Sequence, residues 1–282
     1  MARDELFSGS HLDWLIADGT DNDVVLASRV CLVRNLRELP FPKRADLGQL
    51  AEVAERTAAV LGDVEEALDE PFDGVELSKC TALEQNVLWE KQLISRILLK
   101  NPAHRSAYIS NDRSMSILIN EENHLRIQAM TAGFDLKTPY ERASRVDDVF
   151  EAKLDFAFDE KLGYLTSCPT DLGTGLRASV MLHLPGLVYT ENIGNILNIS
   201  PQIGLSMTAM YGEGAESAGN VFAVANKLSL GLTERELSDN LRISVGEIVA
   251  QERRARKSLM LYDKERIEDE VWRAYGVLHY AR

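Results

Sequence analysis

The segment LRASVMLHLP, from Leu176 to Pro185, has the composition of a β-strand and directly follows the turn residues GTG. Similar segments lie on either side of it: SMSILIN at 114–120, HLRIQAM at 124–130, GYLTS at 163–167 and LSMTAMYG at 205–212. Each is short, rich in β-forming residues and bounded by turn residues. Most follow one another without the crossover helix that parallel strands need. The series therefore predicts an α+β fold, with a large, mostly antiparallel sheet flanked by helices.

Helices are predicted on both sides of this series. Hydrophobic periodicity and capping residues indicate helices at about 11–16, 46–61, 81–95 and 139–158, and a short strand at 24–26. After residue 232 only helical patterns remain. Two successive capping boxes, Thr233 with Glu236 and Ser244 with Glu247, predict two helix starts. A last helix carries an apolar stripe of Ile267, Val271, Ala274, Tyr275 and Leu278.

The composition is that of a soluble globular protein. The 282 residues are 45% hydrophobic and 27% charged, with a net charge of −13. This charge argues against nucleic acid as a partner, because a phosphate-backbone binder normally has a basic surface. The three cysteines are far apart, so neither a zinc site nor a disulfide framework is expected, and no apolar run reaches the length of a membrane span. We expect a reduced, cytoplasmic protein.

The common phosphate-binding motifs are missing from the sequence. It contains no GxxxxGK[ST] loop, which excludes a P-loop protein, and it lacks the HRD and DFG motifs of ordinary protein kinases. The stretch GTGLRA at 173–178 matches a dinucleotide-binding loop only loosely, and a strand rather than a helix follows it.

Arginines and carboxylates near turns remain as candidates. Arg29, Arg126 and Arg177 lie in or beside three separate predicted strands, and arginine binds phosphate oxygens bidentately. Taken singly, each could equally be a solvated residue at a sheet edge. A pair of carboxylates from two loops would clamp a guanidinium, and the candidates are Glu121 or Glu122 together with Glu213. Cys168, after a predicted strand, could add a thiolate or simply be a small buried side chain.

Four motifs occur in a fixed order and carry a family resemblance: ASRVCLVRN at 27–35, NEENHLRIQ at 120–128, TSCPTDLGTGLRASVMLHLP at 166–185 and YGEGAE at 211–216. Together they resemble the guanido phosphotransferases, which include arginine and creatine kinases, and most closely the bacterial protein-arginine kinases. The resemblance implies transfer of the γ-phosphoryl of ATP, with Mg²⁺, to arginine side chains of protein substrates, and it allows a homodimer. It also implies a catalytic domain at 1–230 and a C-terminal helical region at 231–282, which we expect to be incomplete.

The resemblance further implies a role for individual residues. Glu122 and Glu213 would hold and orient the acceptor guanidinium, with Glu122 as the candidate base, and Cys168 would contact the same group. The nucleotide would be bound by residues of three motifs: Ser28, Arg29, His124, Arg126, Arg177, Ala178 and Ser179. No protein metal ligands are implied.

The sequence departs from the family motifs, mainly on the nucleotide side. Cys31 and Thr208 stand where phosphate-binding arginines are expected, and Gln92 stands where a nucleotide-contacting histidine is expected; Asn123 replaces an aspartate and Asp171 an asparagine. The loss of two charged hydrogen bonds would weaken nucleotide binding by about 3–6 kcal/mol. Three interpretations remain. The protein is a working kinase whose phosphate-binding arginine clamp has been rebuilt, or it is a weak or inactive relative that binds arginine-containing partners. In the third, the substitutions are drift in a protein with an unrelated interaction role.

Overall fold

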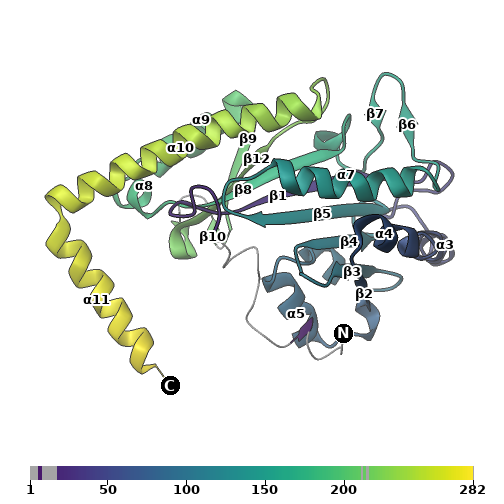
Figure 1. Cartoon of the computed structure of the whole chain (residues 1–282), viewed down its shortest axis with the longest axis horizontal. Helices are drawn as coiled ribbons and strands as arrows, with labels where there is room; N and C mark the ends of the chain where they lie inside the picture. The colour runs from purple at the N-terminus through teal and green to yellow at the C-terminus, as the bar shows by residue number, and fades with distance from the viewer. Residues whose placement is uncertain (1–5, 8–17, 211, 214–215, 282) are drawn as a thin grey trace.

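A computed structural model of the chain describes residues 6–7, 18–210, 212–213 and 216–281, with only the backbone at 212–213 and 216–218 (Figure 1). Its centre is an eight-stranded sheet in the order β2-β3-β4-β5-β1-β8-β12-β9, in which every neighbouring pair is antiparallel. The strands are β1 (Val25–Arg34), β2 (Phe72–Glu76), β3 (Ser106–Ser110), β4 (Met115–Ile119), β5 (Leu125–Ala132), β8 (Leu176–His183), β9 (Leu205–Ala209) and β12 (Val221–Asn226). The predicted fold class is confirmed.

Two short hairpins and a set of helices surround this sheet. The hairpins pair β6 (Phe158–Asp159) with β7 (Gly163–Tyr164), and β10 (Gly212–Glu213) with β11 (Glu216–Ser217). The α-helices are α3 (Leu47–Ala58), α4 (Leu61–Leu68), α5 (Ala82–Glu90), α6 (Arg96–Leu99), α7 (Lys137–Glu151), α8 (Pro185–Tyr189), α9 (Ile193–Ile199), α10 (Glu234–Tyr262) and α11 (Lys264–Tyr280). Short 3₁₀ turns occupy 77–79, 169–171, 200–203 and 218–220.

The main core lies between one face of the sheet and two long helices. Helix α7 packs on β1 and β5, and α10 packs on β8 and β12 (Figure 1). Because side chains alternate along a strand, β1 directs Val30 and Leu32 into this core and Arg29 and Cys31 to the opposite face. A second, smaller core lies under α5 and α6 and includes Leu118 of β4. One face of the sheet is therefore closed and apolar, and the opposite face is covered by the second core over β3 and β4, which leaves its part over β5, β1 and β8 available for chemistry.

Arg34 follows this alternation and also points into the closed side, where it is a charged residue on an otherwise largely apolar face. Its guanidinium forms a buried ion pair with Asp147 of α7 at 2.5 Å, donates to the carbonyl oxygen of Thr174, and lies 3.5 Å from the centroid of the Tyr164 ring. Burial of the Asp147 carboxyl raises its pKa, and Arg34 opposes that effect. Arg34 is therefore a structural residue in this conformation and not a spare charge for the open face.

Several predicted elements differ from the structure in extent. The strand predicted at 24–26 is ten residues long, and the helix predicted at 139–158 ends at Glu151. Only the first two residues of GYLTS form a strand. The predicted helix at 11–16 lies outside the described residues. The helix start predicted at Ser244 is wrong, because α10 continues through it without interruption.

The first capping box, by contrast, is real. Thr233 accepts a hydrogen bond from the backbone N–H of Glu236, and the Glu236 carboxylate accepts one from the backbone N–H of Thr233. The apolar stripe of Leu237, Leu241 and Val245 runs past Ser244 and packs on the sheet, so tertiary burial holds that region in one helix. A capping-box spacing inside a continuous apolar stripe is therefore a weak start signal.

A buried carboxylate fastens α10 to the rest of the domain. Glu252 is 0% exposed, and its two oxygens accept from the backbone N–H groups of Gly186 and Leu187 at 2.8 and 2.9 Å. Arg256, one turn further along α10, donates to the same carboxylate at 2.6 Å and also to the carbonyl oxygens of Asp23 and His183. This group of contacts joins α10 to α8, to the end of β8 and to the residues before β1.

Helix α11 follows a break at Asp263 and turns away from the body of the protein (Figure 1). Its predicted apolar stripe is largely exposed, including Val271, Tyr275 and Leu278. The proposed boundary between residues 230 and 231 stays a prediction. Among the described residues, no helix has the length and apolarity needed to cross a membrane.

Candidate functional site

Three arginines from three adjacent strands lie on the open face of the sheet. Arg126 is in β5, Arg29 in the neighbouring β1 and Arg177 in β8. The register places Cys31 directly opposite Gln128 on one side and Arg177 on the other. Ser179 is on the same face and accepts a hydrogen bond from Arg29 Nε at 3.2 Å. The sheet thus brings together residues that lie up to 150 positions apart.

The electrostatics of these arginines favour an anion between them. Burial lowers the pKa of the Arg29 guanidinium, and the positive charges of Arg126 and Arg177 lower it further. Arginine nevertheless stays charged in proteins. A phosphate group placed among the three would relieve their repulsion and accept hydrogen bonds from the planar guanidinium groups.

Glu121 orients one of these arginines, a role that the sequence interpretation did not assign. Its buried carboxylate accepts from Arg126 Nη1 at 2.9 Å. Burial alone would lower the pKa of Arg126, but Glu121, Cys31 and Asp171 together outweigh it and the net shift is upward. Arg126 Nε has no hydrogen-bond partner within the described part of the chain. Glu121 therefore fixes Arg126 in place and leaves part of its hydrogen-bonding capacity unused.

A neutral hydrogen-bonded chain occupies the position of the expected arginine at residue 31. Cys31 is 2% exposed; its sulfur accepts from Arg126 Nη2 at 3.6 Å and donates to Gln128 Oε1 at 3.8 Å. Gln128 Nε2 then donates to the backbone carbonyl of Gln92 at 2.6 Å. Two of the departures from the family motifs, at residues 31 and 92, are thus linked through Gln128. These groups occupy the position of the expected arginine side chain. Because cysteine is neutral, the local charge is one unit less positive than it would be with arginine at residue 31.

Two further departures also lie on this face. An oxygen of Asp171 is 3.7 Å from Arg177 Nη1, so this carboxylate competes with a bound phosphate for Arg177. Thr208 is exposed on the edge strand β9, opposite Ala223 of β12. Its side chain has room to be replaced by a longer one.

The candidate acceptor residues lie on two loops that are hydrogen-bonded to each other. Glu122 is in the turn before β5, its side chain is 34% exposed, and the Lys43 ammonium lies 4.0 Å from it. The half-buried Cys168 follows β7, and its sulfur is 2.9 Å from the Thr170 hydroxyl. The two loops meet where the Ser167 hydroxyl donates to the carbonyl oxygen of Glu122 at 2.5 Å. Glu213 is placed only by its backbone in β10, and its side chain lies outside the described residues.

Two of the residues predicted to bind the nucleotide point away from the open face. Ser28 and Ala178 point to the closed side, since each is adjacent in its strand to a residue that faces the arginine cluster. The Ser28 hydroxyl donates to the carbonyl oxygen of Gly133 at 2.8 Å and so ties down the turn after β5. A role for these two residues in nucleotide binding stays a prediction.

His124 is fully buried and has backbone partners at both ring nitrogens. Nδ1 accepts from the backbone N–H of Leu36 at 2.9 Å, and Nε2 lies 3.0 Å from the carbonyl oxygen of Pro40. Burial lowers the pKa of the imidazole, and the contact with Pro40 opposes this shift. These bonds give His124 a structural role in this conformation, and its predicted contact with a nucleotide stays untested.

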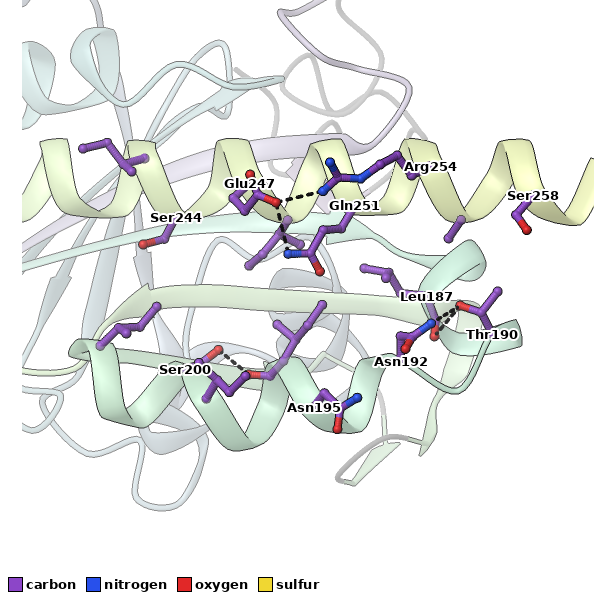
Figure 2. Close-up of a pocket in the computed structure, with 16 residues that line it drawn as sticks. Leu187, Thr190, Asn192, Asn195, Ser200, Ser244, Glu247, Gln251, Arg254 and Ser258 are labelled. Atoms are coloured by element: carbon purple, nitrogen blue, oxygen red, sulfur yellow. Dashed lines mark hydrogen bonds and ion pairs between the residues drawn. The ribbon is translucent and has the colours of Figure 1, made fainter.

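One groove in the described part of the chain is separate from these residues. A groove of about 730 Å³ lies between α10 and the segment from α8 to the 3₁₀ turn after α9, with Ile196, Ile199 and Ile243 among its apolar lining (Figure 2). Glu247 in this groove is hydrogen-bonded to Gln251 and Arg254 on the same helix. None of the candidate arginines, carboxylates or Cys168 lines it. The chemistry-bearing residues are therefore on the open sheet face and not in this groove.

The chain is similar in sequence to curated enzymes over its whole length. It is 44% identical to a protein-arginine kinase of Desulforamulus reducens and 40% identical to one of Brevibacillus brevis. Each alignment covers all of this chain and 79% of the relative.

Solved structures show the same fold. The lombricine kinase structure superposes with a TM-score of 0.72 at 25% identity, covering 89% of this chain and 72% of that chain. The duplicated taurocyamine kinase of Schistosoma mansoni with bound transition state analog components gives a TM-score of 0.73 at 25% identity, over 88% of this chain. This chain spans 35% of the length of that duplicated protein.

A family model agrees with these similarities. The catalytic domain described as "ATP:guanido phosphotransferase, C-terminal catalytic domain" matches residues 52–255, most of the chain. The arginines of β5 and β8 and the two acceptor loops lie within this match. The chain therefore belongs to the ATP:guanido phosphotransferase family.

Proposed function

We propose that this protein is a protein-arginine kinase, which transfers the γ-phosphoryl group of ATP to the guanidinium of an arginine in a protein substrate. The observation that carries the proposal is the arrangement of Arg29, Arg126 and Arg177 on one sheet face, beside the joined loops of Glu122 and Cys168. The names of the relatives with 40–44% identity support the choice of a protein-bound arginine as the acceptor.

In the proposed mechanism the chain contributes position and charge. Arg29, Arg126 and Arg177 hold the phosphate oxygens and balance the charge that develops on them during transfer. Glu122 accepts hydrogen bonds from the acceptor guanidinium and takes up the proton that the attacking nitrogen loses. Cys168 contacts the same guanidinium and limits its rotation. Glu213 completes the carboxylate pair in this proposal.

Magnesium is the expected companion of the nucleotide. In reactions of this kind Mg²⁺ is usually bound by one or two carboxylates together with phosphate oxygens and water. When bound, Mg²⁺ would neutralise phosphate charge, and the carboxylates of Glu121 and Glu122 would be candidates to accept hydrogen bonds from its water shell. The charge of Mg²⁺ would in part offset the two arginines of the family motif that this chain lacks, at Cys31 and Thr208.

A catalytically weak relative that binds arginine-containing partners is the less favoured alternative. It drew its support from the departures at Cys31, Gln92 and Thr208. In the structure Cys31 and Gln92 are joined through Gln128 in a hydrogen-bonded chain that also includes Arg126. A rebuilt clamp accounts for this arrangement without a loss of activity.

The proposal is tested by a direct assay for the product. We expect the purified chain, given Mg-ATP and an arginine-rich unfolded protein, to form an acid-labile phosphoarginine modification that mass spectrometry can locate. Addition of EDTA should abolish the reaction, and substitution of lysine for arginine in the acceptor protein should do the same. If Mg-ATP binds and no phosphoarginine forms at any substrate concentration, the kinase proposal is wrong.

The substitution Thr208→Arg should tighten nucleotide binding. The side chain is exposed at the edge of the sheet on the arginine face, so an added guanidinium can reach a phosphate without displacing core residues. One charged hydrogen bond contributes about 1.5 kcal/mol, which corresponds to a roughly tenfold lower Kd for Mg-ADP by calorimetry. Thr208→Gln is the control of similar bulk without charge and should change Kd less than about threefold. Equal effects of both variants would place the phosphates elsewhere.

A further inference from the structure

Asn123 sits at the junction of three chain segments on the acceptor side. The side chain is 2% exposed. Its oxygen accepts from Asn35 Nδ2 at 2.7 Å and from the backbone N–H of Ser167 at 2.8 Å. Asn35 directly follows β1, Asn123 is the residue after Glu122, and Ser167 is the residue before Cys168. One oxygen atom therefore links the loop of the candidate base to the loop of the candidate thiol.

The neighbouring Asn35 makes this junction rigid. It is also buried, and its oxygen accepts from the backbone N–H of His124 at 2.9 Å. Its amide nitrogen donates to Leu165 as well as to Asn123, so both ends of the side chain have partners. His124 adds the two ring contacts to Leu36 and Pro40 described above. A buried polar group with all its partners in place holds its neighbours in one arrangement.

We propose that Asn123 is a positioning residue that aligns Glu122 with Cys168 for phosphoryl transfer. The inference rests on the proposed function. It follows from the two bonds to one oxygen, because removing them leaves, among the described residues, the Ser167 hydroxyl bond to Glu122 and the bridge through Asn35 to join the two loops. Small displacements of reacting groups are costly in such reactions, and a shift of about 1 Å can lower the rate by about 10²-fold.

The same geometry explains why an asparagine is tolerated where the family motif has an aspartate. Both partners of the oxygen are donors, so a carboxylate and an amide oxygen serve equally well as the acceptor. An alanine cannot make either bond and would leave a buried N–H group without a partner. The departure at residue 123 is therefore conservative in function, unlike those on the nucleotide side.

The test compares three substitutions in the full chain. Asn123→Ala should lower kcat for arginine phosphorylation about 10- to 100-fold, with KM for Mg-ATP within about threefold of the parent, because the acceptor side alone is displaced. Asn123→Asp should recover kcat to within about threefold. Ser167→Ala, which removes only the hydroxyl bond to Glu122, should lower kcat about 3- to 10-fold. This variant replaces Asn123→Ala in the test if Asn123→Ala does not fold.

A second measurement does not depend on kinase activity. Alkylation of Cys168 by iodoacetamide, followed by site-resolved mass spectrometry, reports how firmly the thiol loop is held. We expect the rate to rise about tenfold in Asn123→Ala and to stay within about twofold of the parent in Asn123→Asp. Asn226→Ala is the matched control: Asn226 is also buried, and its hydrogen bonds among the described residues go to backbone groups of β8 and not to either loop, so Cys168 alkylation should not change.

The outcomes separate this inference from the proposed function. Unchanged alkylation of Cys168 in Asn123→Ala overturns the positioning role, whether or not the chain phosphorylates arginine. Faster alkylation with kcat within threefold of the parent also overturns it. If the parent chain forms no phosphoarginine, the proposed function fails, while the alkylation series still decides whether Asn123 holds the two loops together.

Discussion

Replacing Glu122 with glutamine is expected to lower kcat for arginine phosphorylation by about 10²–10⁴-fold, the range typical for loss of a general base. Glutamine keeps the size of the side chain and one acceptor oxygen, but it cannot take up the proton of the attacking guanidinium nitrogen. The side chain is about one-third exposed and its nearest cation, on Lys43, is 4.0 Å away, so the fold should be unaffected. Initial rates of phosphoarginine formation at saturating Mg-ATP give the measurement.

The control for this variant is Glu160→Gln, in the turn between β6 and β7. Glu160 is exposed, so the same chemical change should leave kcat within about twofold and confirm that a lost surface charge is not the cause. Binding of Mg-ADP should be similar in both variants. If Glu122→Gln retains more than a fifth of the parent kcat, Glu122 is not the base.

Among the proposed substitutions, Glu252→Ala should cause the largest loss in the free energy of unfolding. The substitution leaves Arg256 without its carboxylate and leaves the N–H groups of Gly186 and Leu187 buried without partners. Breaking a buried pair in this way costs about 3–5 kcal/mol in the free energy of unfolding. Urea denaturation followed by circular dichroism should show a lower midpoint with little change in slope.

Glu247→Ala is the matched control on the same helix. The side chain of Glu247 is 61% exposed and pairs with Arg254 on the surface, so its loss should change the free energy of unfolding by less than about 1 kcal/mol. A comparable, small effect of Glu252→Ala would mean that water replaces the lost carboxylate and that α10 is held by its apolar residues alone.

The fold class could be predicted because each strand can be recognised from its own local sequence. Short β-rich segments between turn residues indicate an antiparallel sheet whatever their partners are. The length of β1 could not be predicted, because the charged Arg34 interrupts the apolar pattern and its partners Asp147 and Thr174 lie 113 and 140 positions away. The false helix start at Ser244 has the same origin: burial against the sheet overrides a local capping signal.

The candidate site was predicted from ordered motifs, and its geometry depends on strand register. Arg29, Arg126 and Arg177 meet because β5, β1 and β8 are neighbours, which no local pattern in the sequence states. Strand alternation does explain why Ser28 cannot face the same way as Arg29. Gln128 and Asn35 could not be assigned a role beforehand, because their importance comes from partners that lie far away in the sequence.

Strand β1 has one face in the core and one face on the reaction side, and this division affects how the protein can evolve. Even-numbered residues such as Val30 and Leu32 maintain the interior, and odd-numbered ones such as Arg29 and Cys31 face the reaction side. Substitutions at Arg29 and Cys31 therefore change the reaction side and leave the contacts of Val30 and Leu32 in the main core in place. A lineage can exchange a phosphate-binding group for a thiol, and later reverse the exchange, while the scaffold stays intact throughout.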